Sequence, residues 1–179
     1  MSGMTPELKD LPSWPIDQIV ACIGSTDAAP GGGAACGVVV ALAAACALKA
    51  VVMTLKHRPD DAALTAAAAR LHEIAADALK GAADDALIFG QVIAAYHLPK
   101  DSAGEIDARH AAVRRSAAEA VEVGKGLKAL AIELKAIMED LQHGIAANMV
   151  SDVRTALALA SAAELIEADT IEDNRKMGD

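Results

Sequence analysis

The chain has 179 residues, of which 54% are hydrophobic and 2% aromatic, and its formal net charge is −9. This length predicts one domain, and the scarcity of aromatic side chains predicts a core of Ala, Leu, Val and Ile, which favours packed helices over a sheet. The acidic balance argues against nucleic acid and anionic membranes as partners, so any groups that bind an anion must be gathered locally.

The first stretch of the chain is polar and contains two prolines, so we expect residues 1–13 to be a flexible N-terminus before a single domain over 14–179. A short helix is predicted from Trp14 to about Ile23, followed by the loop GSTDAAPGGG. The next helix, from about Gly33 to Lys56, begins with an uncharged apolar run. Because this run is rich in Ala and Gly, we expect a buried central helix rather than a membrane span.

Three more helices are predicted, over about 61–96, 105–142 and 148–174. Pro59 ends the preceding helix, and Asp60 can cap the next one. The helix over 105–142 carries a coiled-coil-like seam. The seam consists of Leu127, Leu130, Leu134, Ile137 and Leu141. Four long helices joined by short loops predict an all-α fold, an antiparallel up-and-down bundle with one short N-terminal helix.

The three cysteines are Cys22, Cys36 and Cys46, and none of them forms a CxxC motif. The N-terminal stretch has no apolar signal-peptide region, so we expect a reducing, cytoplasmic location. Cys36 and Cys46 lie inside the apolar run, where a thiol is expected to pack as a small hydrophobic side chain.

An acidic residue stands out in the helix predicted over 61–96. Asp85 falls on the same helical stripe as Ile74, Ala78, Phe89 and Val92. A buried carboxylate is costly unless it is paired, so Asp85 needs either a partner or a raised pKa, and both make it a functional candidate. A purely structural interpretation stays open, in which Asp85 lies at the edge of the stripe and pairs with Lys or Arg of a neighbouring helix.

Two other polar groups allow a structural and a functional interpretation. Asn148, Ser151 and Asp152 open the last helix, where they can cap it or can hold a polar heterocycle. Lys56 ends the second helix, where a cation is favoured by the helix dipole or can bind an anion together with Lys100. The scattered histidines and the sequence HEIAA at 72–76, which lacks a second His, favour no metal site.

Three segments in a fixed order carry a more specific signal. They read APGGGAACGVVVALAAACALKAVVMTLK, DDALIFGQVIAAYHLPK and NMVSDVRTALALA. With them, the chain resembles the cyclodeaminase/cyclohydrolase family from about Trp14 to Asn174. That family includes the C-terminal domain of formiminotransferase-cyclodeaminase and the bacterial methenyl-tetrahydrofolate cyclohydrolases.

The resemblance implies a helical bundle that forms a homodimer and takes a tetrahydrofolate derivative as its substrate, with no permanently bound cofactor. It also implies catalytic roles for two residues: Asp85 as the base or acid, and Lys56 as an orienting charge or proton donor near it. The substrate-binding positions that it implies are Pro30, Gly31, Gly32, Gly33, Lys100, Asn148, Ser151 and Asp152. Lys100 or Arg58 is expected to meet the folate glutamate tail.

The activity expected from the resemblance is hydrolysis of methenyl-tetrahydrofolate to formyl-tetrahydrofolate by metal-free acid–base catalysis. Three alternatives stay open: a formimino-tetrahydrofolate cyclodeaminase that releases ammonia, a folate-binding paralogue without activity, and a purely structural bundle. The sequence departs from the family pattern at Ala34, where many members carry Ser. It also has Asp169 and Asp173 where many members have Asn.

Overall fold

The computed structural model describes residues 7–178, and these residues contain no strand. Two small elements come first, the 3-10 helix η1 (Leu8–Ser13) and the short helix α1 (Ile16–Ile23). Four long helices make up most of the chain. They are α2 (Gly32–Leu55), α3 (Ala62–Tyr96), α4 (Ala103–Leu141) and α5 (Val150–Gly178), with the 3-10 helices η2 (Gln142–Gly144) and η3 (Ala147–Met149) between the last two.

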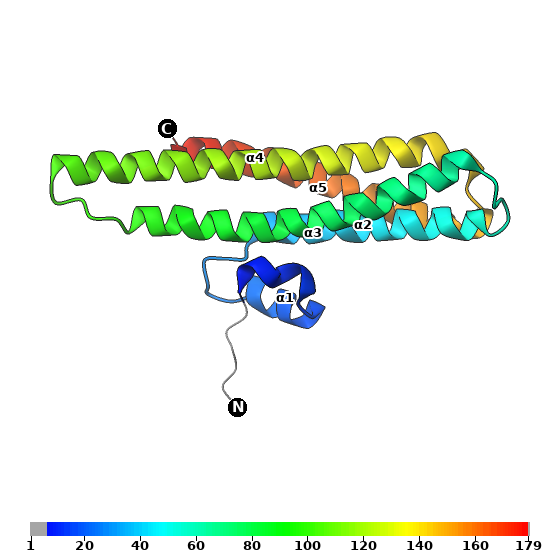
Figure 1. Cartoon of the computed structure of the whole chain (residues 1–179), viewed down its shortest axis with the longest axis horizontal. Coiled ribbons are helices and arrows are strands. Elements are labelled where there is room, and N and C mark those ends of the chain that lie inside the picture. Colours follow the sequence, from blue (N-terminus) through cyan, green and yellow to red (C-terminus); the bar gives the residue numbers. More distant parts are fainter. Residues whose placement is uncertain (1–6, 179) are drawn as a thin grey trace, which may run out of the picture.

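The four long helices form an antiparallel up-and-down bundle, which confirms the predicted fold class (Figure 1). Helix α2 packs against α3 and α5, and α4 packs against the same two helices from the opposite corner. The α3–α4 hairpin extends well past the start of α2, as the left part of Figure 1 shows. Helix α1 and η1 lie on one side of the bundle, where η1 contacts α3.

Local side-chain contacts explain where the helices begin. Asp61 caps α3, because its carboxylate accepts a hydrogen bond of 3.1 Å from the backbone N–H of Leu64. The expected cap at Asp60 was therefore wrong by one residue. At the start of α4, Ser102 and Glu105 form a reciprocal capping box. Helix α5 begins at Val150, two residues later than expected, because η3 occupies the preceding residues.

The N-terminal segment is more ordered than its sequence suggested. Leu11 is completely buried in a small cluster with Ile19 of α1 and Ala34 of α2. Burial of a leucine contributes about 2 kcal/mol toward holding η1 against the bundle. Residues 8–13, part of the segment expected to be flexible, thus form η1 with a buried leucine, and residues 1–6 lie outside the described part of the chain.

Helix α2 is the core helix of the bundle. By length and composition alone it could cross a membrane, but here it packs between α3 and α5. Its small residues allow close approach of the neighbouring backbone. A Cβ atom added to Gly37 would lie 2.8 Å from the Cβ of Ala82 and 2.9 Å from the carbonyl oxygen of Ala78 on α3. This tight contact fixes the start of α2 against the middle of α3.

Candidate functional site

A cavity of about 230 Å³ lies where α2 begins. Because α3 runs on past that point, its side chains border the space in front of the first turn of α2. The cavity is lined by Gly31, Gly32, Gly33, Asp85, Phe89, Thr170, Asp173, Asn174 and Met177. Three helices therefore contribute to it: the first turn of α2, the middle of α3 and the last turns of α5.

The three glycines have different neighbours. A Cβ atom added to Gly33 would lie 2.6 Å from the carboxyl carbon of Asp85, so no other residue fits there while Asp85 keeps its position. Nothing lies within 4 Å of the corresponding point on Gly31 or Gly32. Gly33 thus makes room for the Asp85 carboxyl group, whereas Gly31 and Gly32 border open space that a ligand can use.

Asp85 is half-buried beside the start of α2. Burial raises the pKa of its carboxyl group to about 6, and the backbone N–H of Ala34 acts in the opposite direction. Within residues 7–178, Asp85 forms no ion pair. The structural interpretation, with Asp85 tied to a lysine or arginine, is therefore not what the structure shows.

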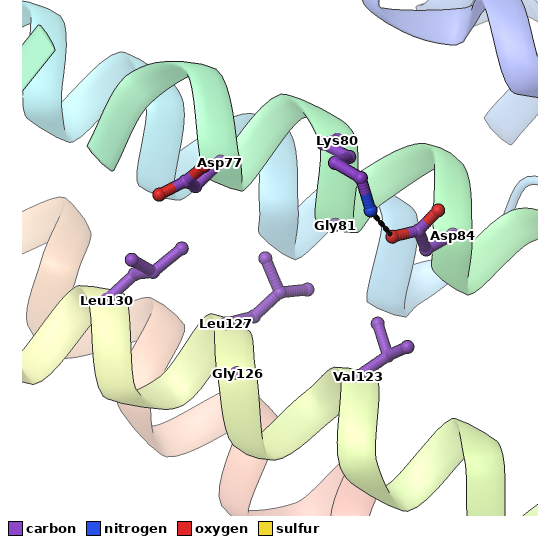
Figure 2. Close-up of a pocket in the computed structure, with 8 residues that line it drawn as sticks. All are labelled: Asp77, Lys80, Gly81, Asp84, Val123, Gly126, Leu127 and Leu130. Carbon is purple, nitrogen blue, oxygen red and sulfur yellow. Dashed lines mark hydrogen bonds and ion pairs between the residues drawn. The ribbon is translucent and has the colours of Figure 1, made fainter. Parts of the chain in front are cut away.

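The preceding residue, Asp84, has a different environment. Its carboxylate forms an ion pair of 2.6 Å with Lys80, one turn earlier on α3. Figure 2 shows this pair at the edge of a groove between α3 and α4, where Val123, Leu127 and Leu130 of α4 face α3. Leu127 packs toward Gly81, which has no side chain to oppose it. Apart from the ion pair, the groove is lined mainly by aliphatic side chains.

A second acid near the cavity was missed by the sequence analysis. Glu167 of α5 is 1% exposed, and its Oε1 atom has no hydrogen-bond partner among the described residues. Burial raises the pKa of Glu167 to about 7; the Cys36 thiol opposes this shift and the charge of Asp85 adds to it. The signal was present in the sequence, because Glu167 continues the stripe of Ala156, Ala160 and Ala163.

Cys36 lies between the two acids. Its thiol donates a hydrogen bond of 3.5 Å to the carbonyl oxygen of Ala163, and it also faces Glu167. Burial, followed by the charges of Glu167 and Asp85, raises the pKa of this thiol far above its ordinary value. The Cys36 side chain is therefore a neutral packing group, as expected from the sequence.

The other expected site residues do not reach this cavity within one chain. Lys56 directly follows α2, about 35 Å along the helix from Gly33 at 1.5 Å per residue. Asn148, Ser151 and Asp152 lie at that same end, where α5 begins, and Ser151 lies 3.5 Å from Asp152.

Lys100 lies in the α3–α4 loop, beyond the end of α3, which itself extends about 17 Å past Asp85. The expectation that Lys56 lies near Asp85, and that Lys100 and the start of α5 share its site, is therefore wrong for a single chain. The reason is the length of α2. Asp85 lies beside its start, whereas Lys56 and the beginning of α5 lie beside its end, at the other end of the bundle. Pro30 is buried and directly precedes the glycines that line the cavity.

The departures from the family pattern fall around the same cavity. Ala34 is completely buried, so its methyl group packs in the core while its N–H faces Asp85. Asp173 lines the cavity, whereas Asp169 is exposed and does not. Asn174, one residue further on, is 6% exposed and also lines the cavity, so an amide side chain lies next to Asp173 at the site.

Two comparisons with known proteins return matches. The family model described as formiminotransferase-cyclodeaminase matches residues 15–177. The crystal structure of formiminotetrahydrofolate cyclodeaminase from Thermotoga maritima superposes with a TM-score of 0.77 at 23% sequence identity. That alignment covers 91% of this chain and 79% of the other, and at this identity it shows a shared fold. A search of curated proteins finds no match.

Proposed function

Because this chain belongs to the formiminotransferase-cyclodeaminase family, we propose that it acts on the one-carbon unit of tetrahydrofolate and releases ammonia from formimino-tetrahydrofolate. The observation that carries this proposal is Asp85, a carboxyl group in the cavity at the start of α2 that has no cationic partner among residues 7–178. A carboxyl group with a pKa of about 6 can both accept and donate a proton near neutral pH.

The reaction requires one proton acceptor and one proton donor. The formimino group is an amidine and enters as its protonated cation, with two hydrogens on its nitrogen. The folate N10 atom attacks the formimino carbon, a carbon–nitrogen bond forms, and the Asp85 carboxylate accepts the N10 proton. The neutral carboxyl group then returns a proton to the formimino nitrogen, whose bond to carbon breaks as ammonia leaves. The product is the methenyl cation, so Asp85 ends the cycle as it began, and general acid–base catalysis of this kind contributes about a hundredfold or more.

The cavity also provides a surface for a flat ring. Gly31 and Gly32 face open space, and the first backbone N–H groups of α2 precede its first internal hydrogen bond, from Ala35 to Gly31. Such N–H groups can donate to the polar edge of a pterin or to a carboxylate. Phe89 lines the same cavity and can pack against the ring.

The glutamate tail of the substrate requires cationic groups, and we assign these to Arg114 and Arg175. Both border a second cavity of about 440 Å³, which shares Asn174 with the first cavity. The earlier assignment of Arg58 is wrong for one chain, because Arg58 lies at the far end of α2. There it donates a hydrogen bond of 2.9 Å to the carbonyl oxygen of Gly144 and pairs with Asp61.

Hydrolysis of methenyl-tetrahydrofolate is the second candidate, and the partial exposure of Asp85 supports it. Water that reaches the methenyl carbon would give a proton to the Asp85 carboxylate as the carbon–oxygen bond forms. Asp85 would then protonate the ring nitrogen whose bond to carbon breaks. The remaining hydroxyl proton would pass to solvent as the C=O bond forms, which leaves the formyl product. The same acid–base group serves both reactions, so only the substrate distinguishes them.

We also propose that the protein forms a homodimer. Helix α2 has almost no charge, yet Leu42 and Val52 on its outer side are 50% and 38% exposed. A second copy that covers this face would remove both side chains from water. Sedimentation or size-exclusion analysis of the wild-type protein and of Leu42→Lys tests this, and a monomeric wild-type protein would contradict it.

The activity experiment compares two substrates and two variants. Purified protein is given formimino-tetrahydrofolate, with ammonia as the readout, and separately methenyl-tetrahydrofolate, with loss of its absorbance as the readout. We expect turnover of the first substrate, a large loss with Asp85→Asn, and little change with Asp84→Asn. Turnover of methenyl-tetrahydrofolate alone would replace the deaminase by the cyclohydrolase. Folate binding without turnover of either would identify a non-catalytic paralogue.

A further inference from the structure

Glu167 is a buried acid that the proposed reaction does not use. It is 1% exposed, and its Oε1 atom has no hydrogen-bond partner among the described residues. An ionised carboxylate in such a place is costly unless a cation compensates it. Within residues 7–178, Glu167 forms no ion pair with Lys, Arg or His. Packing of hydrophobic side chains alone would not favour an acid at this position.

Three groups on the neighbouring helices lie against Glu167 or act on its charge. The Cys36 thiol faces it from α2, and the charge of Asp85 acts on it from α3. From α4 the neighbour is Gly124, where an added Cβ atom would lie 3.0 Å from the Glu167 Oε2 atom. None of these three groups is a cation. The neutral, protonated form of Glu167 is therefore the form that this environment favours.

The two acids lie at adjacent levels of the bundle. Asp85 rests against Gly33, and Glu167 faces Cys36, three residues later on the same side of α2. The two contacts are thus separated by about one helical turn along α2. A glycine makes room for each carboxyl group, Gly33 for Asp85 and Gly124 for Glu167. The glycines at these two positions therefore leave space in the bundle for two acids, about one helical turn apart.

We propose that Glu167 is a positioning residue for Asp85, and that the two carboxyl groups form one unit that holds a single proton at neutral pH. Asp85 carries the charge, because it faces the cavity and the N–H groups at the start of α2. Glu167 holds the proton, because it is enclosed by apolar groups and a thiol. Burial raises the pKa of both groups, and the charge of Asp85 raises that of Glu167 further, which agrees with this order of ionisation.

The consequence for catalysis rests on the proposed function. While Glu167 is neutral, Asp85 can accept a proton and return it. Once Glu167 ionises, the second negative charge raises the proton affinity of Asp85, which then holds a captured proton too tightly to pass it on. The acid limb of the pH–rate profile then reports the charge of Asp85, and the alkaline limb reports the proton of Glu167.

The first experiment measures proton binding directly and needs no substrate. Side-chain carboxyl signals of the full-length protein are followed by ¹³C NMR against pH, and the Glu167 signal is identified by its loss in Glu167→Gln. We expect it to titrate well above the ordinary glutamate range, and Asp85→Asn to lower its midpoint. An ordinary midpoint, or one that Asp85→Asn does not move, overturns the proposal. If Glu167→Gln does not fold, the shift of one high-pH glutamate signal by Asp85→Asn decides the question.

The second experiment measures the pH dependence of kcat. Glu167→Gln is expected to lose the alkaline limb and keep the acid limb, because glutamine has no proton to lose. The matched control is Glu164→Gln on the same helix, where Glu164 pairs with Lys135 at 2.8 Å near the surface, and both limbs should remain. An alkaline limb that persists in Glu167→Gln overturns the proposal. If neither folate is turned over, the proposed function fails, and the titration still decides whether the pair exists.

Discussion

Asp84 and Asp85 are neighbours in the chain but lie in two different regions of the molecule. Successive residues of a helix are rotated by about 100°. This rotation directs Asp84 to the groove between α3 and α4, where Lys80 pairs with it (Figure 2). Asp85 points instead to the start of α2, without a cation and against the backbone of Gly33. The comparison shows that an acid marks the candidate site only where no cation neutralises its charge, since both residues are acids and only Asp84 has a lysine partner.

The largest expected effect on turnover comes from removing the Asp85 carboxylate, and removal of the Asp84 carboxylate is its control. Asp85→Asn should lower turnover by about a hundredfold or more, because the amide can neither accept nor donate the transferred proton. Asp84→Asn removes only a surface ion pair, which is worth about 1 kcal/mol or less in stability. Steady-state kinetics with formimino- and methenyl-tetrahydrofolate measure both variants. Equal effects of the two substitutions would contradict the assignment of Asp85.

A smaller effect is expected from displacing Asp85 without removing it. Gly33→Ala places a methyl group where the Asp85 carboxyl group now lies, so turnover should fall by about tenfold as the acid is pushed out of position. Gly104→Ala, in the first turn of α4 and away from the cavity, is the control, because nothing lies within 4 Å of its added methyl group. The comparison of kcat for the two variants, with melting temperatures as a check on folding, tests whether Gly33 serves Asp85 or only the helix start.

The pH dependence of stability sharpens the comparison between paired and unpaired acids. The folded-state pKa values of Asp85 and Glu167 are raised to about 6 and about 7, so the unfolded chain loses these protons first as the pH rises. The free energy of unfolding should therefore decrease from about pH 4 to about pH 7. In Glu167→Gln, the decrease between pH 4 and pH 8 should be smaller than in the wild-type protein by about 3 kcal/mol, since each pKa unit corresponds to about 1.4 kcal/mol.

Urea unfolding at a series of pH values measures this difference. Asp84→Asn should leave the pH dependence of stability as it is in the wild-type protein, because a surface ion pair contributes little. A wild-type protein whose stability rises between pH 4 and pH 7 would show that neither buried acid behaves as its surroundings imply.

The smallest effect is expected at the opposite end of the bundle. Lys56→Ala should leave turnover close to that of the wild-type protein, because Lys56 lies about 35 Å along α2 from Gly33. Kinetics at matched protein concentrations check this expectation. A loss as large as that of Asp85→Asn would mean that a second copy of the chain brings its Lys56 to the cavity, and the site would then belong to the dimer.

Much of the fold follows from local patterns. Apolar spacing and the residues that interrupt it, such as Pro59 and Pro99, placed the four long helices within a few residues of their observed ends. Asp85 was found because an acid interrupts an otherwise apolar stripe. Glu167 interrupts the stripe of α5 in the same way, but no motif that the sequence shares with the family marks this position. The grouping of Lys56 with Asp85 failed because motif order along a chain carries no distances.

The sequence by itself determined that the chain is a bundle of four long helices with a core of small side chains, since periodicity and helix capping are local properties. It also singled out Asp85 and the three glycines. Only the tertiary structure decided that Gly33, among the three glycines, lies against Asp85. It also placed Glu167, which the sequence had not singled out, about one helical turn away. The physical reason is that the environment of a carboxyl group depends on what three neighbouring helices present to it, and this is set by how the helices pack.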